Sequence, residues 1–141
     1  METKNLFVDD GVVTYSLNGK IDVFINPTDS AFVKRLFDAF DYLDSKQDAY
    51  REEVEKLADK KKIFAIAEAR DKEMREIIDG VFEAPVCAAL FGSMNVYAYA
   101  NGLPVWCNLM LGVMDEVDTT FAREQKATNA RITKYTQKYK K

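Results

Sequence analysis

The stretch that decides the fold is "VFEAPVCAALFGSMNVYAYANGLPVWCNLML", residues 81–111. It holds the densest apolar run, both cysteines, the only tryptophan and two of the three prolines. Pro85 and Pro104 fit the first turns of two helices, because a first turn leaves its backbone N–H groups unpaired in any case. Gly92 ends the first of these helices, and a segment that Ser93 caps leads into a loop at "NGLP". The apolar side chains exceed what one amphipathic face needs.

This apolar surplus predicts that residues 81–111 are part core and part docking surface, with the Phe82–Gly92 segment and the Trp106 helix side by side. Methionine and large aromatic side chains supply adaptable contact area for partners. Plain core packing is the alternative interpretation for each residue taken singly. The candidate docking residues are Phe82, Phe91, Met94, Tyr97, Tyr99, Trp106, Met110 and Met114.

Upstream, the first part of the chain predicts a β-hairpin at about residues 11–25. Apolar and polar residues alternate on both sides of "LNGK". Asn-Gly between alternating runs is a strong hairpin signal, because both residues tolerate the positive φ of a type I′ turn. The residues expected to pack on the helices are Val13, Tyr15, Ile21 and Val23.

Between the hairpin and the decisive stretch, the pattern predicts helices. "NPTDSAFVKRLFDAFDYLD" offers Thr28 or Asp29 as a cap, followed by apolar residues at three- and four-residue spacing. Residues 45–79 form a second, charge-rich helical region without Gly or Pro. "DKKK" inside it indicates a bend or solvated turn, with one continuous helix as the alternative. Gly80 is expected to end or loosen this region. The fold class is therefore mainly α (α+β), with a small N-terminal hairpin on a multi-helix bundle.

Charge divides the 141 residues into an acidic body and a basic tail. Residues 121–141 carry seven Lys or Arg against one acid, a net charge of +6, whereas the rest carries 13 against 22, a net charge of −9. The expected organisation is one helical domain over 1–120 and a flexible basic tail over 121–141. The tail interleaves charge with tyrosines, as nucleic-acid contacts can, but the acidic body repels phosphate.

The composition argues against catalysis, metal and cofactor. Without histidine the chain lacks the commonest general base and metal ligand. Cys87 and Cys107 lie too far apart for a C-x-x-C site, and we expect both to be reduced, buried and apolar in role. Phosphate-loop, dinucleotide and nucleophile-elbow motifs are missing. No window reaches the roughly 18 apolar residues of a membrane helix, and no signal peptide is seen, so a cytoplasmic location is expected.

The stretch "EIIDGVFEAPVCAALFGSMN" followed by an apolar helix resembles the tail assembly chaperones of long-tailed bacteriophages of Gram-positive hosts. In that family a similar pair of motifs precedes a closing helix. Here "IDGVF" (78–82) and "LFG" (90–92) match at similar separation. Glu83 stands where the family often has glycine, and Ser93 where it often has aspartate. The hairpin, the long charged helix and the basic C-terminal region are similar to phage and prophage proteins of this type.

The resemblance implies a passive function. Such a chaperone coats the aggregation-prone tape-measure protein until tail-tube subunits displace it, without a covalent step. The expected partners are therefore the tape-measure protein and a tail-tube protein, and further copies of the chain, since long helices with wide apolar stripes favour self-association. Two alternatives stay open: a nucleic-acid-associated phage protein that uses the basic tail, and a homo-oligomeric structural module.

Overall fold

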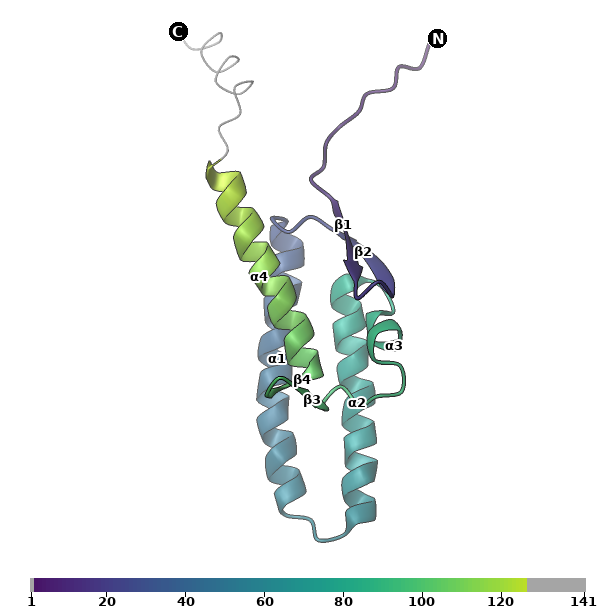
Figure 1. The fold of residues 1–141 in the computed structure, drawn as a ribbon, viewed down its shortest axis with the longest axis vertical. Helices are drawn as coiled ribbons and strands as arrows, with labels where there is room; N and C mark the ends of the chain where they lie inside the picture. Colours follow the sequence, from purple (N-terminus) through teal and green to yellow (C-terminus); the bar gives the residue numbers. More distant parts are fainter. Residues whose placement is uncertain (1, 127–141) are drawn as a thin grey trace.

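The computed structural model describes residues 2–126 and has a mainly helical architecture with a two-stranded hairpin near the N-terminus (Figure 1). Two long helices run antiparallel, and a third crosses beside the first of them. The elements in chain order are β1 (Val13–Leu17), β2 (Ile21–Ile25), α1 (Ser30–Glu55), α2 (Lys60–Phe82), α3 (Val86–Phe91), β3 (Tyr99–Ala100), β4 (Leu103–Pro104) and α4 (Val105–Lys126). The predicted mixed, mainly α class is confirmed.

The first hairpin forms as the alternation predicts. Asn18 and Gly19 both take positive φ, 54° and 67°, as a type I′ turn requires. The register pairs Tyr15 with Val23, so the apolar residues of both strands share one inner face, except Phe24, which is 67% exposed on the other face. The prediction for Val13 is wrong: it lies on that face, but at the open end of the hairpin, and stays 38% exposed.

Each of the two long helices begins at an aspartate that caps its N-terminus. Asp29 accepts a hydrogen bond from the backbone of Ala31, and Asp59 one from Lys61, at 3.0 and 2.9 Å. The bend expected at "DKKK" is thus confirmed, because Asp59 begins a new helix there. The two segments that the sequence separates near residue 45 instead form one helix, since nothing there interrupts the hydrogen-bond ladder of α1.

A tight corner joins α2 to α3. Gly80 was expected to end or loosen the helix; it does not end it, because α2 continues to Phe82 and buries Val81 and Phe82 beyond the glycine. Glu83 then turns the chain in the left-handed conformation, with φ 54°. Pro85 and Gly92 flank α3 as predicted. Asp79 connects the two helices, because its Oδ1 accepts a hydrogen bond from the Cys87 backbone N–H at 3.0 Å.

Residues 93–104 form a clamped loop and a second small hairpin. The expected helix with Ser93 as its cap is wrong: the loop is held on α2 instead, where Asp71 Oδ1 accepts from the Val96 backbone N–H at 2.7 Å. The second Asn-Gly pair, Asn101 and Gly102, turns β3 into β4 with φ 54° and 81°. The backbone N–H of Trp106 donates to the Val96 carbonyl, which fixes the beginning of α4.

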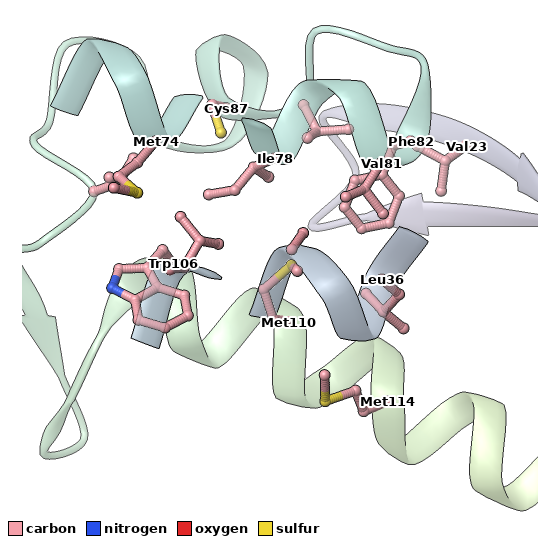
Figure 2. Packing of buried hydrophobic residues seen from close by; sticks show 14 of the residues in the cluster. Val23, Leu36, Met74, Ile78, Val81, Phe82, Cys87, Trp106, Met110 and Met114 are labelled. Carbon is pink, nitrogen blue, oxygen red and sulfur yellow. The ribbon is translucent and has the colours of Figure 1, made fainter. Parts of the chain in front are cut away.

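The core lies where α1, α2, α3, β2 and α4 meet. Figure 2 shows Trp106 and Met110 of α4 among side chains of the other elements, including Leu36, Met74 and Ile78. α4 continues to Lys126, so the domain boundary expected at 120 lies inside a helix; the remainder of the expected flexible tail, 127–141, lies outside the described residues. Over residues 2–126 no helix combines the length and apolar character needed to cross a bilayer.

Candidate docking groove beside α4

One side of α4 is closed by the core. Met110 is 0% and Trp106 1% exposed. The indole N–H of Trp106 donates to Gln47 Oε1 at 3.0 Å, and its ring meets Phe40 with centroids 5.7 Å apart. These contacts fix α4 against α1, and the buried aromatic and sulfur-containing side chains carry much of the stability of the fold.

The neighbouring side of α4 faces an open groove. A cavity of about 480 Å³ lies between this side and the inner face of the β1–β2 hairpin, and the end of α3 lines it as well. We call it the α4 groove. Its main apolar lining residues are Tyr15, Leu17, Val23 and Ile25 from the hairpin, Leu90 and Phe91 from α3, and Val105, Leu109, Val113 and Val117 from α4. The size and lining match those of a ligand-binding pocket.

Gly112 sits on the groove side in the middle of α4. A glycine inside a helix costs about 0.5–1 kcal/mol relative to alanine. Here packing within the chain does not require it, since a Cβ added at this position meets no heavy atom within 4 Å. The glycine leaves room for another backbone to approach α4 closely, which is what a groove with an occupant needs.

The polar contacts of the groove lie on its rim. Tyr15 donates its hydroxyl to Glu116 Oε1 at 3.1 Å, which joins the hairpin to α4 across the groove. Burial, followed by the hydrogen bond to Glu116, raises the pKa of Tyr15, so this hydroxyl stays a donor at neutral pH. Asp115 and Asp118 are exposed beside Glu116. The lining is therefore mainly apolar, and the one acid that lines it is Glu116.

The eight predicted docking residues are divided by the structure. The prediction is wrong for four of them, which are 8% exposed or less, because they fill the space between the helices: Phe82, Trp106, Met110 and Met114. Phe91 and Tyr97 are half-buried, and only Phe91 lines the α4 groove. Met94 and Tyr99 are 50% and 68% exposed and remain available to a partner. Tyr97 instead stacks on Tyr50, with centroids 5.1 Å apart.

The Phe82–Gly92 segment and the Trp106 helix were expected to lie side by side. In the structure, Leu90 and Phe91 line the same groove as the residues of α4. The groove residues of the hairpin and Leu109, Gly112 and Val113 were not among the predicted docking residues. A mid-helix glycine without a turn to explain it was the available sequence signal.

The remaining chemistry of the described residues is structural. Cys87 is buried as predicted, and burial, followed by nearby Asp79, raises the pKa of its thiol to about 12, which keeps it protonated and unreactive. Cys107 is only half-buried, so the prediction of full burial is wrong for it. Among residues 2–126, no group of three His, Cys, Asp or Glu side chains is placed to hold a metal ion.

The residues that carry the phage-chaperone resemblance form the α2–α3 corner. Asp79 of "IDGVF" caps α3, and Gly92 of "LFG" ends it. Glu83 stands where the family often has glycine, and it adopts the left-handed conformation that glycine adopts without strain. The motif thus corresponds to a backbone shape. No protein-family model, curated protein or solved structure matches the chain.

Proposed function

We propose that this chain is a binding protein of the tail-assembly-chaperone type, which holds an apolar segment of the tape-measure protein in the α4 groove until tail-tube subunits displace it. The observation that carries the proposal is the open apolar groove with Gly112 on its α4 side. An amphipathic helix or extended segment that exposes apolar side chains fits such a groove.

Two further observations support this proposal. Met94 and Tyr99 lie outside the groove but are 50% and 68% exposed, so they offer apolar contact area on the surface. The positive φ of Glu83 occurs at the position where the resembling family often has glycine, which favours the alignment on which the phage assignment rests.

Binding by this groove requires no chemical step. Apolar surface that a partner buries is removed from water, which stabilises the complex by about 25 cal/mol per Å² of buried area. A bound partner segment is withdrawn from aggregation by mass action, and it is released when a better binding surface forms on the growing tube.

Co-expression tests the proposed function. A fragment of a phage tape-measure protein is expressed alone and together with this chain, and the soluble fraction of the fragment is measured. We expect a clear rise in the soluble fraction and co-purification of both chains. The complex should persist as salt is raised, because apolar contacts are not screened. If this chain is well folded and the partner gains no solubility, the proposal is contradicted. It is also contradicted if salt dissociates the complex, because salt dependence is what binding through phosphate contacts would show.

A further inference from the structure

Residues 2–12 form an arm that leaves the body beyond β1 (Figure 1). Three consecutive large apolar residues lie on it almost fully open to water: Leu6 is 85%, Phe7 96% and Val8 76% exposed. Single exposed apolar side chains are common, but a run of this kind marks a contact surface.

The base of the arm is fixed. Asn26 Nδ2 donates a hydrogen bond to the Asp10 carbonyl at 2.8 Å. The side chain of Asp9 accepts from the Gly11 backbone N–H, and that of Asp10 from the Val12 backbone N–H, at 3.0 Å each. Gly11 takes φ +71°, and a Cβ there would lie 2.7 Å from Asn26 Nδ2. These contacts fix the base of the arm, and from there the arm leads away from the body (Figure 1).

The arm and the α4 groove are complementary. The arm offers a short apolar run, and the groove offers an apolar cavity of about 480 Å³ with free space next to Gly112. Lys4 precedes the apolar run, and the exposed carboxylate of Glu116 lines one end of the groove. A segment that places Leu6–Val8 in the groove can therefore bring Lys4 to this carboxylate.

We propose that two copies of this chain exchange arms, so that Leu6, Phe7 and Val8 of each copy occupy the α4 groove of the other. A two-fold arrangement buries both exposed runs and fills both grooves through one repeated contact. The chain from Leu6 to Gly11 can span up to about 17 Å at roughly 3.4 Å per residue, which gives the run the reach to contact a second copy.

The exchange itself does not depend on the proposed function. If the function also holds, the arm is a placeholder, because a partner segment and the arm compete for one groove. Loss of the arm contact then raises partner capture, whereas a blocked groove loses both self-association and capture. The self-association test needs no partner, so failure of one proposal leaves the other open to its own test.

Sedimentation velocity of the full chain tests the exchange. We expect a dimer at about 100 μM, which corresponds to a micromolar dissociation constant. Phe7→Glu removes the arm contact and Gly112→Leu fills the groove, and each should raise the constant at least about tenfold. Phe64→Glu and Gly80→Leu are the matched controls, since Phe64 is 69% exposed on α2 and Gly80 is a helical glycine with open space; both should leave the dimer unchanged.

Disulfide trapping identifies the occupant of the groove. In a Cys107→Ser background, a chain with Phe7→Cys is mixed with a chain with Gly112→Cys, and the double variant is made in one chain. A link between chains, seen as a covalent dimer, is expected. A link only within the double variant would show that each arm folds into its own groove and would overturn the exchange. So would the absence of any link, or a wild-type monomer at the concentration above.

Discussion

The two sides of α4 differ in what covers them. One side presents Trp106 and Met110 to α1 and α2, and almost nothing of these side chains remains exposed (Figure 2). The adjacent side presents Leu109, Gly112 and Val113 to a cavity. Both sides are apolar in sequence, so hydrophobicity alone does not distinguish them. One side of α4 therefore holds the fold together, and the other side is the one to which we assign the proposed docking function.

The largest expected effect is on the closed side. Trp106→Ala should lower the free energy of unfolding by about 3–5 kcal/mol, because it leaves a cavity and orphans Gln47 Oε1. Leu109→Ala, on the groove side, is the matched change and should cost clearly less, since Leu109 is already half-exposed. Urea unfolding of both variants measures the difference. Equal losses would mean that the two sides of α4 are packed alike.

Alkaline pH sharpens the same contrast. Burial raises the pKa of Cys87 from an ordinary value of 9.0 to about 12, so the unfolded chain loses this proton before the folded one does. Stability due to this group is complete below pH 9 and falls as pH rises toward 12, at up to about 1.4 kcal/mol per pH unit.

Urea unfolding between pH 9 and 10 tests this slope. Burial also raises the pKa of Tyr97 to about 12 and the pKa of Cys107, so both groups contribute in this range, and the effect of Cys87 is the difference between the wild type and Cys87→Ala. The Cys87→Ala variant should be less stable than the wild type at neutral pH because of its small cavity, yet show a shallower decline between pH 9 and 10. Identical slopes in the two proteins would show that the thiol titrates as it does in water.

The corner that supports the closed side is strained at one residue. Glu83→Gly should raise the free energy of unfolding by about 1 kcal/mol, because glycine adopts the left-handed conformation without the cost that a Cβ imposes. Glu83→Ala keeps the Cβ and should bring no gain. A thermal melt of each variant checks the pair. If alanine stabilised as much as glycine, the carboxylate rather than the backbone would be the cause.

The smallest expected effect is on the open side. Gly112→Ala should stabilise the chain by about 0.5–1 kcal/mol, because alanine is the better helix former and its methyl group meets open space. Thermal unfolding of the isolated protein measures the gain. A loss of stability would show that the hairpin already packs against this position and that the groove is closed.

The sequence predicts the elements whose signals are local. The first hairpin follows from alternation around Asn18–Gly19, and the bend before α2 follows from the capping position of Asp59. The second Asn-Gly pair carries the same turn signal, but strands of two residues show no alternation to support it. Gly80 remains helical because burial of Val81 and Phe82 outweighs a penalty of about 1 kcal/mol.

The candidate site was predicted less well than the fold, for a physical reason. Its walls come from residues 15–25 and 105–117, which only the tertiary arrangement brings together. Helical periodicity places Trp106, Leu109, Met110 and Val113 on one broad apolar stripe, and it does not reveal which part of the stripe meets the core. Large aromatic and sulfur-containing side chains are therefore predicted to form a docking surface, although in the structure four of the eight fill the core.

The most direct test of the central claim compares two helical glycines in the co-expression assay. The soluble fraction of the tape-measure fragment is measured with the wild type, with Gly112→Leu and with Gly80→Leu, after melting curves have shown that all three are folded. Gly112→Leu should lose the ability to keep the fragment soluble, while Gly80→Leu should retain it, since only the leucine at position 112 fills the α4 groove. Full rescue by a folded Gly112→Leu variant would contradict the assignment of the groove as the docking site.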